Sequence, residues 1–429
     1  MAFLVPVSLG ESSLLSELPA SPIITPIKED REPDLNMRGS VRPVAAAIYR
    51  HGRKDLCCGL WFAIIRLQKL RPANLFSRII EHFLTPEKAR IMLAQQDQPC
   101  EATWRRLYEA AIAYKEAGCW NWMSDSDIFG VKDPITGETG YCCILGAAGE
   151  VLGMSVYRGT PGLEVYLKLL SRETGAGDPD FLFIHRCLMA DFHDRDELDK
   201  ADRDVIRSLG LKFRGRNAWP QFRSYLPGYF PWYLTEAEAR FLALAVEQGL
   251  NVCQRFRHSP SLFSSGRRGA YLVRTAREKE GQLVWEDEWL EPEAFEEEGL
   301  SFEPLDEARL ARIKETLKPR DQIWEGDFFH LNNPVKEEGR PFYPRLFVWA
   351  DVGSGLLLSH DMKHPDNPIA ILRESLISAA EKSGFLPGEI RVRRHEAYEL
   401  LSPLAESLKI KLVKARALHA VDQLRRMLS

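Results

Sequence analysis

The last part of the chain shows a regular alternation of strand and helix patterns, and this order constrains the fold more than any other feature. Residues 345–350 and 355–360 are apolar runs separated by a short Gly- and Ser-containing turn at 351–354, which predicts a β-hairpin. Pro368 opens a helix that Gly384 ends, and strand and helix patterns then alternate to the end of the chain. The predicted string is β-β-α-β-α-β-α, which requires a mixed sheet with helices packed on it.

The chain ahead of this region predicts a second α+β domain. Residues 101–116 repeat apolar side chains at three- and four-residue steps, which is typical of an amphipathic helix. Residues 141–145 and 151–157 flank a Gly-containing turn and predict another hairpin. Residues 217–234 are rich in aromatic side chains and proline, so we expect an extended segment there. At roughly 150 residues per domain, the chain is expected to be a multi-domain α+β protein.

Charge is unevenly distributed along the chain although the formal net charge is only −4. Residues 41–90 hold ten Lys or Arg against three Asp or Glu, whereas residues 285–307 hold eleven acids and no Lys or Arg. An acidic run of this kind repels itself and should be solvated. We therefore predict five segments: a flexible arm 1–40, a short basic helical region 41–98, a middle α+β domain 99–284, an acidic connector 285–320 and a C-terminal domain 321–429.

Several function classes are disfavoured by the sequence. The eight cysteines include no Cys-x-x-Cys pair, so the usual zinc spacing is missing and we expect reduced thiols in the cytoplasm. No apolar stretch approaches the roughly 20 residues that a membrane helix needs, so we expect no membrane partner. Phosphate-loop, dinucleotide-binding and nucleophile-elbow motifs are missing as well, so no cofactor is predicted from motifs.

Four segments carry a resemblance to a known group of proteins. Residues 131–141, 219–220, 227–232 and 349–355 resemble a group of bacterial two-domain proteins known as families of unknown function, over roughly residues 100–429. That group implies no established activity. The C-terminal domain also resembles the ribonuclease H-like fold of integrases and transposases, and this second resemblance does imply a chemistry.

The ribonuclease H-like resemblance implies three carboxylates: one on the first strand, one after the strand that follows the first helix, and one on the last helix. Asp351, Glu396 and Asp422 match these places, with Asp351 as a metal ligand and Mg²⁺ or Mn²⁺ as the cofactor if the domain is a nuclease. Arg393 and Arg394 fall where the second acid is expected, and they oppose metal binding. We therefore favour a degenerate site that keeps the fold without the activity.

Two other segments predict binding. Residues 391–429 hold nine Lys or Arg against four acids, which suits phosphate contacts, and also suits pairing with the acidic connector. The aromatic segment 217–234 suits stacking on bases or a peptide, or equally the covering of a core. The candidate binding residues are Arg391, Arg393, Arg394, Trp219, Arg223, Tyr229 and Trp232.

The leading hypothesis is therefore an intracellular, non-catalytic binding or regulatory protein that acts on nucleic acid. Two alternatives stay open. One is a divalent-metal-dependent nuclease of the ribonuclease H-like class, which uses the three acids named above. The other is a protein-interaction module in which the aromatic segment contacts a protein partner.

Overall fold

The computed structural model describes residues 97–149, 151–171, 183–264, 266–294, 307–337 and 339–428. The predicted flexible arm 1–40 and all but the last two residues of the predicted basic helical region 41–98 lie outside this part of the chain. Both sheets described below belong to one compact unit, Thr103–Ser429.

A seven-stranded mixed sheet organises the middle domain, with the strand order β5-β4-β3-β2-β1-β6-β7. All neighbours in it are antiparallel except β1 and β6, which pair in parallel. The strands are β1 Phe129–Lys132, β2 Thr139–Leu145, β3 Gly153–Arg158, β4 Cys187–His193, β5 Trp219–Tyr225, β6 Tyr271–Lys279 and β7 Gln282–Leu290.

Helices cover both faces of this sheet. They are α5 Glu101–Ala117, α6 Gly159–Ser171, α7 Lys200–Ser208 and α8 Glu236–His258, with single 3₁₀ turns at Cys119–Asn121, Arg195–Glu197 and Pro260–Phe263. Helix α8 begins at a capping box, in which the Thr235 side chain accepts from the backbone of Glu238 and the Glu238 side chain accepts in return from Thr235. Neighbouring Cys142 and Cys143 point into opposite cores, which explains why β2 reads as a continuous apolar run.

Strand β1 of the middle domain was not predicted. Residues 285–290, which their run of acids placed at the start of the acidic connector, form most of β7. Their acids are tolerated in a strand because basic side chains neutralise them: Asp287, for example, pairs with Arg255 at 2.6 Å and with Arg274 at 2.7 Å.

A five-stranded mixed sheet organises the C-terminal domain, with the order β10-β9-β8-β11-β12. Strands β8, β9 and β10 are antiparallel neighbours, whereas β11 runs parallel to both β8 and β12. The elements are α9 Glu307–Thr316, β8 Lys318–His330, β9 Arg345–Asp351, β10 Leu357–Lys363, α10 Ile371–Ser383, β11 Phe385–Val392, α11 His395–Leu408, β12 Lys411–Lys414 and α12 His419–Leu428.

The central strand β8 is absent from the predicted string. Three acids, Asp321, Glu325 and Asp327, interrupt its apolar residues, so the segment did not read as a strand. With β8 in place the string becomes β-β-β-α-β-α-β-α, and an antiparallel meander joins two parallel strands through helical crossovers. The predicted mixed α+β, multi-domain class is confirmed, and the C-terminal sheet has one strand more than predicted.

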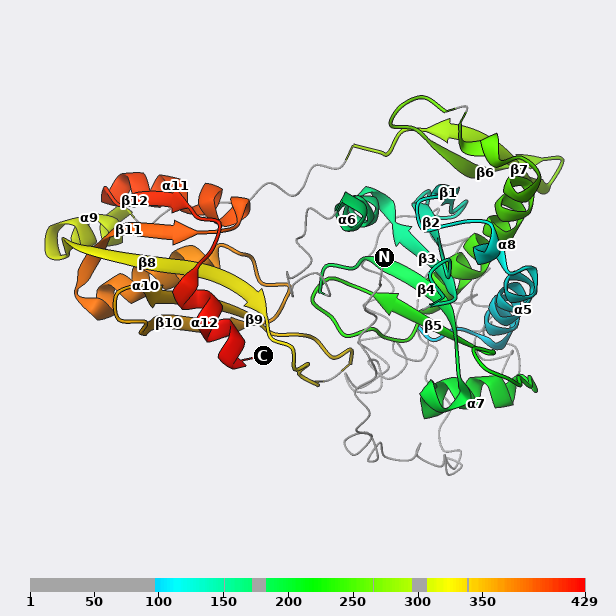
Figure 1. Ribbon diagram of the computed structural model, residues 1–429, viewed down its shortest axis with the longest axis horizontal. Coiled ribbons are helices and arrows are strands. Elements are labelled where there is room, and N and C mark those ends of the chain that lie inside the picture. Colours follow the sequence, from blue (N-terminus) through cyan, green and yellow to red (C-terminus); the bar gives the residue numbers. More distant parts are fainter. Residues whose placement is uncertain are drawn as a thin grey trace, which may run out of the picture. The chain divides into compact units, whose positions relative to one another are not determined.

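The two faces of the C-terminal sheet differ in kind. Helices α10 and α11 cover one face over a large apolar core that includes Trp324 and Trp349. Helix α12 packs on β8 and β9 at the other face over a small cluster that includes Phe329, Val348 and Val421. Figure 1 shows α12 (red) crossing in front of the strands and α10 behind them. The second face therefore has room for polar groups beside its small core.

None of the described helices has both the length and the apolar character to cross a membrane.

Candidate functional site

Two carboxylates of the central strand point to the α12 face of the C-terminal sheet. Side chains alternate along a strand, and Trp324 and Phe328 belong to the α10–α11 core, so Glu325 and Asp327 point the other way. Both have an exposed fraction of 0 %. Buried carboxylates of this kind are costly unless they are hydrogen-bonded or paired, so their partners define what this face can do.

Arg393 joins Asp327 to Asp422. Its Nη2 donates to Oδ2 of Asp327 at 2.7 Å, and its Nη1 lies 3.0 Å from Oδ1 of Asp422 on α12. Arg394 adds a second contact, because its Nε donates to Oδ1 of Asp327 at 3.1 Å. Both arginines follow directly after β11, which is the parallel neighbour of β8. The two strand ends therefore bring a buried carboxylate and two guanidinium groups together.

The charges in this cluster balance. Burial alone would lower the pKa of the Arg393 guanidinium, but the carboxylates of Asp327 and Asp422 outweigh this effect and raise the pKa. Arg393 thus lies between two carboxylates, in the position that a bridging cation would take. In the part of the chain that the structure describes, no group of three or more His, Cys, Asp or Glu side chains is arranged to hold a metal ion.

Glu325 has a different role, which is to anchor α12. Its Oε2 accepts hydrogen bonds from the backbone N–H groups of Ala420 at 2.8 Å and Val421 at 3.3 Å. These N–H groups belong to the first turn of the helix, where they have no partner within the helix itself. Glu325 therefore fixes α12 on the sheet, and α12 in turn carries Asp422 to Arg393.

Only one of the three predicted catalytic acids lies in this cluster. Asp422 does, but Asp351 is the register partner of Trp324 and so points to the opposite face of the sheet. There its Oδ2 accepts from the backbone N–H of Ser354 at 2.8 Å and from the Ser354 hydroxyl at 2.6 Å, closing the β9–β10 turn. Glu396 is exposed in the first turn of α11. The structure does not bring these three side chains together.

Asp327 is the acid of this cluster that the sequence analysis did not name. It lies on β8, the strand that is absent from the predicted string. The signal that could have found it is the pair of short apolar stretches at 323–324 and 328–329 on either side of the acids. Trp324 and Phe329 are buried and Phe328 is partly buried, as expected for a strand inside a sheet.

The third predicted arginine lies next to this cluster in a smaller network. The Nε of Arg391 donates to Glu389 at 2.6 Å, and Lys411 on β12 donates to the same carboxylate at 2.8 Å. These side chains share the α12 face of the sheet, because Arg391 is the register partner of Glu325 and Lys411 that of Glu389. Arg391 and Lys411 remain partly exposed, with side-chain fractions of 33 % and 70 %.

The predicted aromatic binding segment is engaged in contacts within the chain. Arg223 is buried and pairs with Asp202 at 2.7 Å and Asp199 at 3.0 Å, under the ring of Tyr233. Trp219 is half-buried and packs against other aromatic side chains of the core. These residues therefore stabilise the β4–β5 edge of the middle domain.

Tyr229 and Trp232 lie in the part of the segment that follows β5. The hydroxyl of Tyr229 donates to Oδ2 of Asp366 at 2.5 Å, and burial together with this hydrogen bond raises the pKa of Tyr229 to about 12. Trp232 is half-buried, and its backbone exchanges two hydrogen bonds with Ser224. Arg340, from the β8–β9 loop, donates to the carbonyl oxygens of Phe230 and Ser224.

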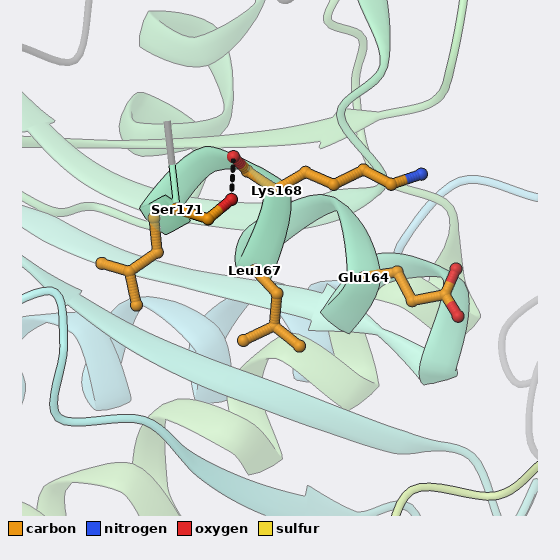
Figure 2. Close-up of a pocket in the computed structure, with 5 residues that line it drawn as sticks. Glu164, Leu167, Lys168 and Ser171 are labelled. Carbon is orange, nitrogen blue, oxygen red and sulfur yellow. Dashed lines mark hydrogen bonds between the residues drawn. The ribbon is translucent and has the colours of Figure 1, made fainter. Parts of the chain in front are cut away.

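A shallow pocket on α6 is lined by Glu164, Leu167, Lys168, Leu170 and Ser171 (Figure 2). The hydroxyl of Ser171 donates to the carbonyl oxygen of Lys168 at 3.2 Å, within the helix itself. All of the lining side chains belong to one helix, so no second element brings a converging polar group to a ligand. We therefore place the candidate site at the Asp327–Arg393–Asp422 cluster.

Two family models match the chain. Residues 104–274 match a Domain of unknown function (DUF7309), and residues 309–429 match a Domain of unknown function (DUF6930). These matches agree with the predicted resemblance to two-domain proteins of families of unknown function. A comparison with curated proteins finds no match.

Some solved structures are similar to part of the chain. One is the catalytic core domain of the HTLV-2 integrase in complex with magnesium, in its trimeric form; it is 22 % identical over 26 % of this chain and 68 % of that chain. The dimeric form of the same domain is 21 % identical over 25 % of this chain and 66 % of that chain. The simian T-cell lymphotropic virus intasome in complex with PP2A regulatory subunit B56 gamma is 23 % identical, over 26 % of this chain and 39 % of that one. The TM-score is 0.20 in each case. Similarities of this size transfer no activity, and the fold of the C-terminal domain follows from its own strand order.

Proposed function

We propose that the C-terminal domain is a non-catalytic binding module and that its ligand is nucleic acid. The observation that carries this proposal is the position of Arg393, which bridges Asp327 and Asp422 at 2.7 and 3.0 Å. A guanidinium group in that position supplies the counter-charge that a metal ion would supply in an active site.

The chemistry of phosphoryl transfer supports the non-catalytic part. Two-metal sites hold cations about 3.5–4 Å apart between converging carboxylates, with ligand positions left open for the substrate. Here both oxygens of Asp327 already accept from arginines. A divalent cation would have to displace Arg393. The same carboxylates would then face two positive charges instead of the one on the guanidinium group.

The charge of the surrounding segment supports the nucleic-acid part. Residues 391–429 carry nine Lys or Arg against four acids, and one of those acids, Asp422, is neutralised by Arg393. Phosphate contacts from Lys and Arg supply most of the affinity of sequence-independent nucleic-acid binding. The module is therefore expected to bind the phosphate backbone and to leave it intact.

The test is a parallel cleavage and binding assay with the full-length protein. Labelled single- and double-stranded DNA and RNA are incubated with Mg²⁺ or Mn²⁺, and binding is measured separately at low ionic strength. We expect binding without cleavage, both in the wild type and in Asp327→Asn. Cleavage that disappears in Asp327→Asn would overturn the non-catalytic part, and a lack of binding at low ionic strength would overturn the nucleic-acid part.

A second variant keeps the originally predicted set of acids testable. Asp351→Asn changes an acid of that set on the opposite face of the sheet from Arg393. If the wild type cleaves nucleic acid and only Asp351→Asn abolishes cleavage, Asp351 belongs to an active site and our proposal is wrong. The two substitutions thus separate the two possible sites within one experiment.

A further inference from the structure

A basic strip runs along the edge of the C-terminal sheet beside the cluster described above. We call it the β11–β12 edge, and it consists of Arg391, Arg393, Lys411, Lys414 and Arg416. Arg391 belongs to the end of β11 and Arg393 follows it, the next two belong to the edge strand β12, and the last to the loop before α12.

The strand register places the members of this strip close together. Arg391 and Arg393 are two residues apart, which separates them by roughly 6.6 Å on the same side of the chain. Lys411 belongs to the neighbouring strand, roughly 4.8 Å away, and pairs in register with Glu389. Lys414 ends β12 and, as the register partner of the buried Val392, lies on the other face of this edge strand, and Arg416 follows in the loop before α12. Several positive charges therefore lie within the reach of a few successive phosphates.

The strip keeps an excess of positive charge. Arg393 is neutralised by Asp327 and Asp422, whereas Arg391 and Lys411 share one carboxylate, that of Glu389, among the described residues. No ion pair joins Lys414 or Arg416 to a carboxylate anywhere in the described ranges, and both side chains are exposed. An excess of exposed positive charge at one edge attracts a polyanion, and it does so more strongly at low salt.

The side chains of the strip also indicate the kind of contact. None of its residues is aromatic, so it offers no ring on which a base can stack. Its side chains are lysines and arginines, which contact phosphate oxygens without reading the sequence. We propose that the β11–β12 edge binds the phosphate backbone of nucleic acid independently of sequence. This inference rests on the proposed function and names the surface that performs it.

The test is the salt dependence of binding to a short labelled DNA duplex of mixed sequence. Each phosphate contact that is lost makes the plot of log affinity against log salt concentration shallower by about one. We therefore expect Lys411→Gln/Lys414→Gln to reduce the slope by about two, and to weaken binding at low salt, relative to the wild type. A duplex of unrelated sequence should compete equally well.

A matched control comes from the same domain. Lys314 and Lys318 are exposed lysines near the start of β8, and neither is paired with a carboxylate among the residues that the structure describes. Lys314→Gln/Lys318→Gln removes the same charge and should leave the slope unchanged. Equal slopes in the two double variants would overturn the β11–β12 edge as the binding surface, while leaving nucleic-acid binding itself in place. A wild-type protein that does not bind the duplex at low salt would instead overturn the proposed function.

Discussion

Replacing Arg393 with methionine should destabilise the centre of the C-terminal sheet. Arg393→Met keeps most of the side-chain volume but removes the charge that faces Asp327 and Asp422. Asp327 has an exposed fraction of 0 %, so water cannot replace the lost partner. Its remaining contacts are the Nε of Arg394 at 3.1 Å and the backbone N–H of Phe328 at 2.9 Å, both to Oδ1. Asp422 is partly exposed and can be hydrated instead.

The size of the effect follows from these contacts. Removing one partner of a buried ion pair costs about 3–5 kcal/mol, and a hydrogen bond to a charged group contributes about 1.5–3 kcal/mol. Because Arg394 still holds Asp327 and the Arg393 side chain is 31 % exposed, the lower part of these ranges applies. We expect a loss of about 2–3 kcal/mol. Adding Asp327→Asn to Arg393→Met should recover part of this loss, because it removes the uncompensated charge.

The assay is native-state hydrogen exchange, read by mass spectrometry on peptides from β8 and β11. A multi-domain chain does not have one unfolding free energy, whereas exchange reports the local opening of each segment. A loss of 2–3 kcal/mol corresponds to amides that exchange about 30- to 150-fold faster. The control is Arg391→Met, whose half-exposed pair with Glu389 should change exchange by less than about fivefold. If Arg393→Met behaves like this control, the bridging role of Arg393 is refuted.

Two further outcomes test other parts of the structure. Gly326→Ala places a Cβ atom 2.5 Å from the ring of the fully buried Trp349. Overpacking of this kind should cost about 1–3 kcal/mol and speed hydrogen exchange in the β8 and β9 peptides. Unchanged exchange would show that the ring moves aside at no cost. In the middle domain, burial alone would lower the pKa of His193, but its 2.8 Å contact with Asp191 outweighs burial and raises it. The folded state therefore holds this proton more tightly, so the stabilisation is complete below pH ~6.5, the unfolded value, and is lost as the pH rises through the higher folded value. We therefore expect the protection of the β4 amides, corrected for intrinsic exchange, to decline as the pH rises, and His193→Gln should abolish this decline. If the decline persists in the variant, another group causes it.

Local patterns predicted a good part of the fold. The helix predicted at 101–116 appears as α5, and the hairpin at 141–157 appears as β2 and β3. These features depend on residues a few positions apart, whose spacing and turn preferences are readable in the sequence. Most of the alternation after residue 345 was readable as well, because apolar runs mark strands there and Pro368 and Gly384 mark the ends of its first helix.

The central strand was not readable, because its polar residues are explained only by partners far away in the chain. Asp327 is compatible with a buried strand because it accepts a hydrogen bond from Arg393, which is 66 residues further along the chain. Glu325 is compatible because the first turn of α12, 95 residues later, uses its carboxylate. Nothing near β8 in the sequence announces either partner, so the acids looked like solvent-exposed charges. The first strand, and with it the candidate site, was therefore placed one strand too late.

The two buried acids of β8, Glu325 and Asp327, have different roles, and these roles connect the fold to the proposed function. Glu325 accepts hydrogen bonds from the first turn of α12, and α12 carries Asp422. Glu325 therefore fixes the position of Asp422. Asp327 and Asp422 are both paired with Arg393, so their negative charge is already compensated by the guanidinium group. Arg393 thus occupies a place where an acid would be a further metal ligand, and it adds positive charge to the sheet face. An acid at this position, as in Arg393→Asp, should therefore weaken duplex binding and strengthen Mn²⁺ binding together. If only one of the two properties changes, they are independent.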